Sequence, residues 1–279
     1  WADDKASYLI ALLACMQTGV VFAPLHPLAP AAWQQSVAAQ LRVAVVAPGL
    51  ASLVSTNWTI NPGHVRSTCG DDVAIMLTSG STGTPRVVPI HAGMIEAAIG
   101  NACGVFALDR DAVFLDYIPP FTVGGLFLSA LPALTAGGTL LVRSFSPYAF
   151  AGIVATERPT HAILLPTMVA VLRNTSSWGE VDLSCFTMIA SGASVVSESV
   201  AAELLGRDVQ HFAHIYGSTE CLTPVMAHTT TRFAPGLCTV FSTVCGDLEA
   251  RLAPDGELLL RGATVTRGYL GDPTQNLAV

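Results

Sequence analysis

The chain has 279 residues, of which 51% are hydrophobic and 12% are charged, and its formal net charge is −7. An acidic chain without a basic stripe is unsuited to binding nucleic acid, which depends on neutralising phosphates with Lys and Arg. Seven scattered cysteines form no Cys-x-x-Cys pair, so we expect reduced, buried thiols in a cytoplasmic protein and no zinc site. Two apolar stretches, 8–25 and 124–142, are interrupted by Gly and Pro, so neither predicts a membrane span of about 20 residues.

Helical and strand patterns alternate along the first 215 residues. In chain order they predict helix 6–17, strand 20–23, helix 31–41, strands 43–46, 73–77 and 86–90, helix 92–106, strand 112–117, helix 124–135, strand 139–142, helix 147–156, strand 161–165, helix 166–173, strand 187–190, helix 197–205 and strand 211–215. Repeated β-α-β alternation predicts an α/β fold, with a mainly parallel sheet covered by helices on both faces.

The last part of the chain has a different character. Beyond residue 224 the helical patterns stop, and short β-rich pieces follow at 224–228, 247–252 and 256–260. Pro254-Asp255-Gly256 predicts a hairpin turn between the last two. We therefore expect an α/β core over 1–223 and an incomplete β-rich subdomain over 224–279.

A loop rich in small and hydroxyl residues separates the strands predicted at 73–77 and 86–90. Residues 77–88 read LTSGSTGTPRVV, and eight of these twelve are Gly, Ser, Thr or Pro. Gly80 and Gly83 permit close backbone approach to an anion, and Arg86 can add a charge-assisted contact. The hydroxyl groups are those of Thr78, Ser79, Ser81 and Thr82. The loop therefore predicts phosphate binding, with an ordinary surface turn as the alternative. It is not a P-loop, because Gly83 is followed by Thr and not by Lys.

The wording of this loop resembles the phosphate-binding signature of the adenylate-forming superfamily. That superfamily includes acyl-CoA synthetases, the adenylation domains of peptide synthetases and firefly luciferase. Its members usually carry Lys at the position of Arg86 and often Gly at that of Val88. Four further segments match in the family's order: 17–30 (QTGVVFAPLHPLAP), 190–193 (ASGA), 215–220 (IYGSTE) and 256–273 (GELLLRGATVTRGYLGDP). The resemblance therefore covers nearly the whole chain.

The resemblance implies roles for the turn after the strand predicted at 211–215. Tyr216 would stack on adenine, Thr219 would bond the α-phosphate and Glu220 would hold Mg²⁺, with Gly217 and Ser218 shaping the turn. Such a turn lies at the carboxyl edge of a parallel sheet, where ligands bind, and Mg²⁺ prefers hard oxygen ligands. A capped turn with a solvated Glu220 is the alternative.

The acyl side of the site is implied by two more segments. The turn Ser191-Gly192-Ala193 would line the adenine and acyl pockets, or else is a plain strand-to-helix turn. In 118–126 (IPPFTVGGL), Thr122 stands where acyl-CoA synthetases often have His and amino-acid-activating relatives have an Asp that pairs the substrate amine. The predicted substrate contacts are Phe121, Thr122, Val123, Gly124 and His214. The alternatives are that 121–127 is helix-start core, or that Asp116 supplies the amine partner.

By the same resemblance, the chain would use ATP and Mg²⁺ to convert a carboxylic acid into an acyl-adenylate. The acyl group would then pass to coenzyme A or to the phosphopantetheine of an acyl carrier protein. A carrier-loading adenylation domain and a non-catalytic nucleotide-binding relative are the rival interpretations. The family's ribose-binding Asp and its mobile C-terminal domain with a catalytic Lys do not occur before Val279, and Trp1 is not a start Met. We therefore expect the central part of a longer ligase, with little activity of its own.

Overall fold

The computed structural model describes residues 2–26, 29–41, 71–78 and 86–270. The chain forms two compact units: unit 1 comprises 1–92, 120–122 and 266–279, and unit 2 comprises 93–119 and 123–265. The division of the chain near residue 223, expected from the sequence, stays a prediction. Within the described residues, no helix is both long and apolar enough to cross a membrane.

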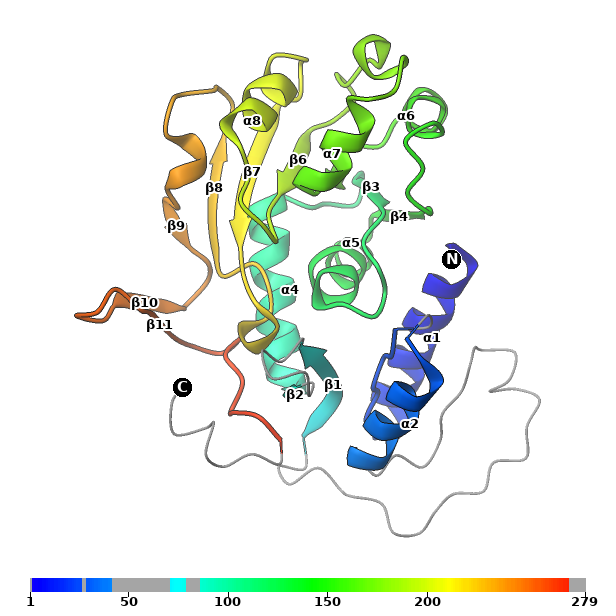
Figure 1. Ribbon diagram of the computed structural model, residues 1–279, viewed down its shortest axis with the longest axis vertical. Helices are drawn as coiled ribbons and strands as arrows, with labels where there is room; N and C mark the ends of the chain where they lie inside the picture. The colour runs from blue at the N-terminus through cyan, green and yellow to red at the C-terminus, as the bar shows by residue number, and fades with distance from the viewer. Residues whose placement is uncertain (1, 27–28, 42–70, 79–85, 271–279) are drawn as a thin grey trace. The chain divides into compact units, whose positions relative to one another are not determined.

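Unit 2 is built on a seven-stranded sheet in the order β4-β3-β5-β6-β7-β8-β9 (Figure 1). β3 to β7 run parallel to one another, whereas β8 pairs antiparallel with β7 on one side and with β9 on the other. The strands are β3 (Val113–Asp116), β4 (Thr139–Val142), β5 (His161–Ile163), β6 (Met188–Ser191), β7 (His211–Tyr216), β8 (Met226–Thr230) and β9 (Thr243–Val244). The predicted α/β fold with a mainly parallel sheet is confirmed.

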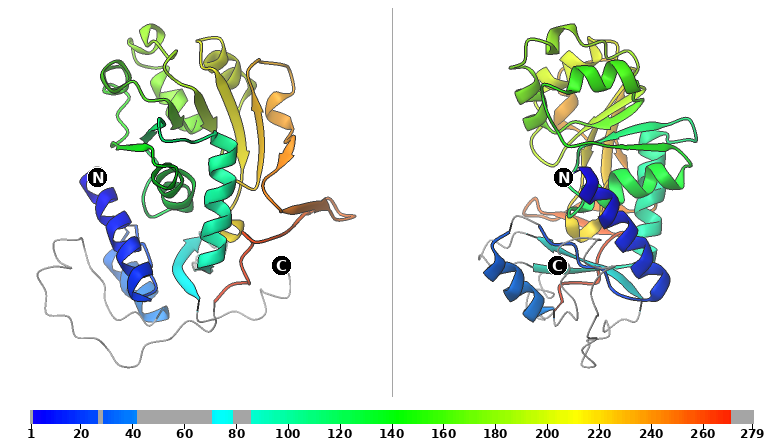
Figure 2. Two further views of the ribbon diagram at one scale, coloured as in Figure 1. Left: turned by 180° about the vertical axis from the view of Figure 1, so that it is seen from behind. Right: turned by 90° about the vertical axis from the view of Figure 1, so that its right-hand side faces the viewer.

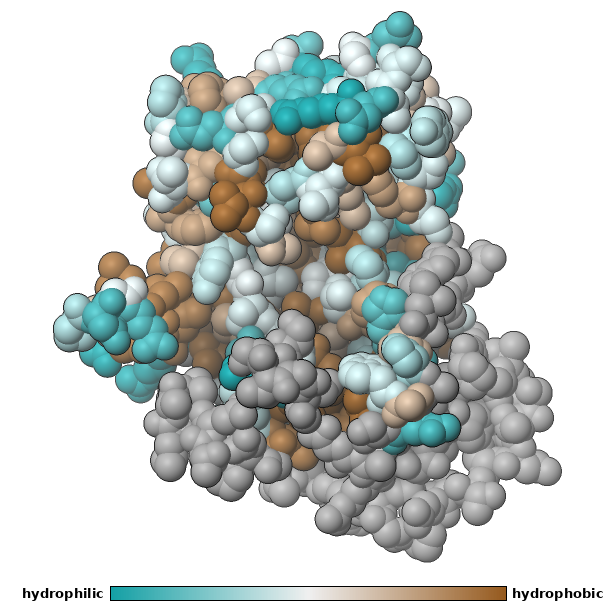
Figure 3. Space-filling model, viewed as in Figure 1, coloured by the Kyte–Doolittle hydropathy of each residue, from teal (hydrophilic) through white to brown (hydrophobic). Residues whose placement is uncertain are grey.

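Helices cover both faces of this sheet (Figures 1 and 2). One layer contains α6 (Phe150–Glu157), α7 (Pro166–Leu172) and α8 (Glu198–Leu205); the other contains α4 (Ala92–Phe106), the π-helix η1 (Gly124–Ala130) and α5 (Leu131–Thr135). Three 3₁₀ turns complete the helical elements described for unit 2: η2 (Trp178–Glu180), η3 (Thr219–Cys221) and η4 (Leu237–Thr239). In Figure 3, polar residues dominate the end of unit 2 that carries α6, α7 and α8, with hydrophobic patches between them.

Successive side chains of the strands point to opposite faces of the sheet and pack into two hydrophobic cores. Leu115 and Phe212 pack into the core under α6, α7 and α8. Their neighbours Phe114 and Ala213 pack into the core under α4 and η1. Strands that are apolar on both faces are typical of a parallel sheet between two helical layers, which is why the sequence shows continuous apolar runs here.

Unit 1 contains α1 (Ala2–Thr18), α2 (Ala31–Gln40) and an antiparallel hairpin of β1 (Asp72–Thr78) and β2 (Arg86–His91). The strand predicted at 20–23 is wrong as a full strand: Phe22 makes only an isolated parallel bridge to Ala74. The bridge ends before Pro24, which has no N–H to donate to a ladder. The strand predicted at 43–46 lies outside the described residues.

Two predicted segments have a different detailed form. The helix predicted at 124–135 is a π-helix followed by α5, and the Leu131 N–H reaches back to the Leu126 carbonyl. Pro132 lacks the N–H that a continuous α-helix would need there. The predicted turn at Pro254-Asp255-Gly256 is confirmed: it joins β10 (Glu249–Leu252) to β11 (Leu258–Arg261) in a separate two-stranded sheet.

Candidate functional site

The residues predicted to form the site are divided between the two units. Unit 1 holds Thr78, Arg86, Phe121 and Thr122, and unit 2 holds Val123, Gly124, Ser191, Gly192, Ala193, His214, Tyr216, Gly217, Ser218, Thr219 and Glu220. The loop residues Ser79, Gly80, Ser81, Thr82 and Gly83 lie outside the described residues.

In unit 2, the turn after β6 lies directly beside the end of β7. Ser191 is fully buried, pairs with His214 in the β6–β7 register, and donates its hydroxyl to the Leu164 carbonyl at 2.8 Å. Gly192 approaches β7 so closely that a Cβ there would lie 2.3 Å from the Ile215 carbonyl oxygen. The Ser191 side chain therefore links the ends of neighbouring strands. In the same turn Gly192 is buried, whereas Ala193 is exposed.

The turn after β7 contains the Tyr-Gly-Ser-Thr-Glu sequence. Tyr216 is the last residue of β7 and is 38% exposed, so one part of its ring is open to solvent. A side chain at Gly217 would lie 2.6 Å from Thr223, and the Ser218 hydroxyl is 3.1 Å from the sulfur of Cys221. Thr219 and Glu220 then begin the 3₁₀ turn η3. The two turns follow neighbouring parallel strands, so they share the carboxyl edge of the sheet.

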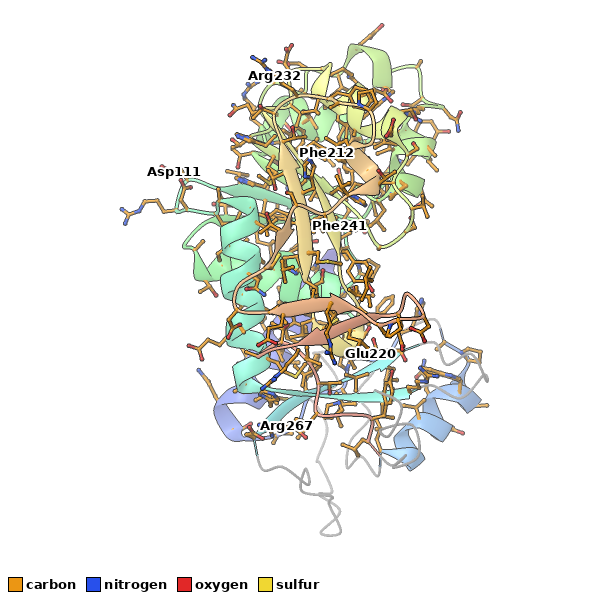
Figure 4. All side chains as sticks on the ribbon, turned by 90° about the vertical axis from the view of Figure 1, so that its left-hand side faces the viewer. Asp111, Phe212, Glu220, Arg232, Phe241 and Arg267 are labelled. Carbon is orange, nitrogen blue, oxygen red and sulfur yellow. The ribbon has the colours of Figure 1, made fainter. Side chains whose placement is uncertain are left out.

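Sequence reasoning missed an aromatic residue at this edge, Phe241. Its ring stacks on His214 with centroids 4.5 Å apart and lies 5.8 Å from the ring of Tyr216. Figure 4 shows Phe241 between Phe212, further back in the sheet, and Glu220 beyond its end. Phe241 precedes β9 in an irregular stretch without periodicity or a motif, so no local signal marks it.

The surroundings of His214 disfavour its charged form. It is buried, and it lies opposite His228 in the β7–β8 pair. Burial lowers the pKa of His214, and the nearby imidazole of His228 lowers it further. Among the described residues, the Nδ1 atoms of both histidines find no hydrogen-bond partner. Together with Phe241, this ring gives the edge an uncharged aromatic wall.

In unit 1, Thr78 and Arg86 lie opposite each other at the end of the β1–β2 hairpin from which the glycine-rich loop departs. The guanidinium carbon of Arg86 lies 5.2 Å from the ring centroid of Tyr269, and its Nη1 donates to the Tyr269 hydroxyl at 3.4 Å. Arg86 is thus placed by a residue from the far end of the chain.

The segment expected to contact the substrate divides at residue 122. In unit 1, Phe121 packs on His26 with ring centroids 4.3 Å apart, and Thr122 is half-buried. In unit 2, Val123 precedes the π-helix and Gly124 begins it.

Asp116, the alternative amine partner, is fully buried and is engaged with the backbone and side chains of unit 2. It accepts the Ile118 N–H at 3.0 Å and the Ser129 hydroxyl at 3.1 Å. These contacts tie the end of β3 to the π-helix.

The side chains that could bind a metal ion are scattered in the described part of the chain. Within the described residues, no group of three or more His, Cys, Asp or Glu side chains is placed to bind a metal ion. A single carboxylate such as that of Glu220 is compatible with Mg²⁺, which commonly takes one or two carboxylates and completes its shell with phosphate oxygens and water.

The family is decided by comparison with known proteins. A model of the family described as AMP-binding enzyme matches residues 51–270. The chain belongs to this family. The AMP-binding match includes both turns at the carboxyl edge of the sheet and the hairpin with Arg86.

Curated relatives fall into two kinds. Indoleacetate–CoA ligase of Aromatoleum aromaticum is 31% identical over 74% of the chain and 42% of its own length, and feruloyl-CoA synthase of an Amycolatopsis species is 29% identical over 97% and 60%. D-lysergyl-peptide-synthetase subunit 2 of Epichloe festucae is 28% identical over 75% of the chain and 16% of its own length. The chain thus spans about half the length of the two CoA ligases.

Solved structures agree on the fold. The N-terminal subdomain of Klebsiella oxytoca NpsA, in complex with 3-hydroxyanthranilyl-AMSN, superimposes with a TM-score of 0.76 at 17% identity, covering 96% of this chain and 74% of that one.

Proposed function

We propose that the chain is part of a longer ligase that activates a carboxylic acid with Mg·ATP to give an acyl-adenylate and pyrophosphate. The observation that carries this proposal is the turn Tyr216–Glu220 at the carboxyl end of a buried parallel strand in a member of the AMP-binding family. The neighbouring Ser191–Ala193 turn lies at the same edge. Ligands of parallel sheets bind at such edges.

The proposed reaction needs no covalent protein nucleophile. A carboxylate oxygen of the substrate attacks the α-phosphorus of ATP, the bond to the bridging oxygen breaks, and pyrophosphate leaves with the electron pair. Tyr216 presents its exposed ring to adenine, Thr219 donates to the α-phosphate, and Arg86 offsets charge on the phosphates. Glu220 would hold Mg²⁺, whose charge would stabilise the phosphate oxygens. The loop 78–83 keeps its predicted role in phosphate binding.

Replacing Glu220 tests this proposal. In the complete protein, Glu220→Ala should slow acid-dependent exchange of pyrophosphate into ATP by about 10²- to 10³-fold, the size expected for one preorganised electrostatic group. Glu180→Ala, at an exposed position of the same unit, is the matched control and should leave the exchange rate unchanged. Near-normal exchange in Glu220→Ala would reject the role of this carboxylate.

We further propose that the acid has an apolar acyl or aryl body and no α-amine. Thr122 brings no charge for an ammonium, and Asp116 is already bonded to Ile118 and Ser129. Phe241 and the neutral His214 add apolar surface. The names of the two CoA ligases likewise refer to aryl acids without an α-amine.

A matched pair of acids tests this specificity. In the complete protein, 3-phenylpropanoic acid should form adenylate faster than phenylalanine, because a buried ammonium without a counter-charge costs several kcal/mol. The measurement is pyrophosphate exchange at equal concentrations of the two acids. A preference for phenylalanine would move the protein to the peptide-synthetase branch.

The acceptor of the second half-reaction is coenzyme A in this proposal, with a carrier-bound phosphopantetheine as the rival that the peptide-synthetase relative favours. Product analysis with each thiol separates the two. A non-catalytic relative would bind Mg·ATP without exchanging pyrophosphate for any acid. We also propose that the 279-residue chain alone exchanges slowly, because orientation by the rest of the ligase supplies a large share of the rate.

A further inference from the structure

A segment from the far end of the chain lies along the outer edge of β2 in unit 1. The Leu270 N–H donates to the Val87 carbonyl at 2.9 Å, and the buried Thr266 donates its hydroxyl to the Pro89 carbonyl at 3.2 Å. Thr266 contacts Pro89 and the later residue Leu270 contacts the earlier residue Val87, so the segment runs antiparallel to β2. Residues 266–270 thus lie against β2 through one backbone and one side-chain hydrogen bond, without forming a strand of the two-stranded sheet.

Both ends of this contact carry an arginine. At one end, Arg267 makes a two-pronged ion pair with Asp71, at 2.8 and 3.0 Å. At the other end, the guanidinium of Arg86 lies over the ring of Tyr269, a residue 183 positions away in the sequence. The hydrogen bonds of the Thr266 hydroxyl and of the Leu270 N–H hold the chain on either side of Tyr269 against β2.

We propose that Tyr269 is a positioning residue: it holds the guanidinium of Arg86 in the orientation that receives the phosphates of ATP. This inference rests on the proposed function. A long Arg side chain loses conformational freedom when it binds an anion, and a partner that orders it in advance lowers that cost. A guanidinium has five N–H donors, so it can interact with a ring and its hydroxyl while other N–H groups stay available to a second anion; a Lys ammonium has three donors at one point.

The test compares ligands with and without phosphates in the complete protein. Tyr269→Leu should weaken Mg·ATP binding about three- to fivefold, as measured by titration calorimetry, and Tyr269→Phe, which keeps the ring, should retain most of the affinity. Adenosine, which carries no phosphate, should bind equally to all variants. Tyr148→Leu removes a tyrosine that is 85% exposed and lies in unit 2, and it should change neither affinity.

A double variant separates positioning from a general structural role. Arg86→Ala should weaken Mg·ATP binding, and adding Tyr269→Leu should weaken it no further, because the ring acts through the guanidinium. A further loss in the double variant, or equal losses in the Phe and Leu variants, overturns the inference. A wild-type protein that binds no Mg·ATP overturns the proposed function and this inference with it, whereas normal binding with additive effects overturns the inference alone.

A second variant guards against loss of folding. If Tyr269→Leu lowers the thermal unfolding midpoint, Arg86→Lys carries the test, since it keeps the charge and loses the guanidinium that contacts the ring. It should weaken Mg·ATP binding as much as Tyr269→Leu while its unfolding midpoint stays that of the wild type. Unchanged affinity in Arg86→Lys overturns the inference.

Discussion

Gly192 has no space for a side chain, because a Cβ would lie 2.3 Å from the Ile215 carbonyl oxygen and 2.8 Å from Cγ1 of the Ile215 side chain. The first obstacle is backbone, so the strand ends themselves would have to separate. This close approach brings the turn after β6 and the turn after β7 together. The glycine is therefore required by the contact between strands, whatever ligand the edge binds.

We predict that Gly192→Ala lowers the free energy of unfolding by about 1–3 kcal/mol, the usual cost of overpacking a well-packed position. Urea denaturation followed by circular dichroism measures it. Gly152→Ala is the control, because a Cβ at Gly152 meets nothing within 4 Å and alanine favours helix α6. A Gly192→Ala protein as stable as the wild type would show that the strand ends can separate freely.

The π-helix η1 is fixed to the sheet through a buried polar contact. Ser129 is fully buried and lies within hydrogen-bond distance of Asp116 Oδ2 and of the Gly124 and Gly125 carbonyls, each at 3.1 Å. The single hydroxyl hydrogen is shared among, or directed to one of, these three oxygens. The same contact keeps the carboxylate of Asp116 directed toward the protein interior.

We predict that Ser129→Ala destabilises the protein by about 1–3 kcal/mol, because a buried carboxylate loses one of its donors. Ser144→Ala, at an exposed serine of the same unit, should change the unfolding free energy by less than about 0.5 kcal/mol. Equal stabilities of the two variants would indicate that Asp116 finds another donor without cost.

Local patterns predicted most elements because burial repeats with a fixed period in each of them. The helix predicted at 92–106 coincides with α4, and the strands predicted at 139–142 and 73–77 coincide with β4 and with the body of β1. Long-range pairing leaves no such period. The sequence therefore did not reveal that β8 and β9 join the main sheet, nor that 266–270 lies along β2.

Motif order located the candidate site, but its contacts depend on the three-dimensional fold. The turns at Ser191–Ala193 and Tyr216–Glu220 were placed at strand ends by their wording, and β6 and β7 do end there. Phe241 and the ring of Tyr269 reach their partners through tertiary structure alone. The catalytic and binding roles of these residues stay predictions.

We predict that the buried histidines make the folded protein less stable in acid. His161 is buried, its Nε2 lies 3.0 Å from the Phe106 carbonyl and its Nδ1 lies 2.8 Å from the Thr160 hydroxyl, an arrangement that a neutral ring satisfies. Burial lowers the pKa of His161 despite an opposing effect of the Phe106 carbonyl, and burial also lowers the pKa of His214.

The sign of the pH effect follows from these shifts. In the unfolded chain the histidines have a pKa of about 6.5. Below that pH the unfolded chain therefore binds more protons than the folded chain, in which the pKa values of the buried histidines are lower. Stability should therefore fall as the pH drops from about 7.5 to about 5.5, and the urea midpoint should fall with it. In His161→Gln the difference between the two midpoints should shrink. A wild-type midpoint that is equal at both pH values would contradict the neutral, buried state of these rings.

The two units differ in the number of separate chain segments that form them. Unit 2 draws on 93–119 and 123–265, whereas unit 1 needs segments from three separate stretches, the last of which starts at 266. During synthesis, β2 is made long before Thr266 and Leu270 emerge to bond its outer edge. Because domains tend to fold as their residues leave the ribosome, unit 2 can acquire its sheet while the hairpin still presents an open strand edge. During that interval the open edge of β2 can pair with the edge of a neighbouring chain.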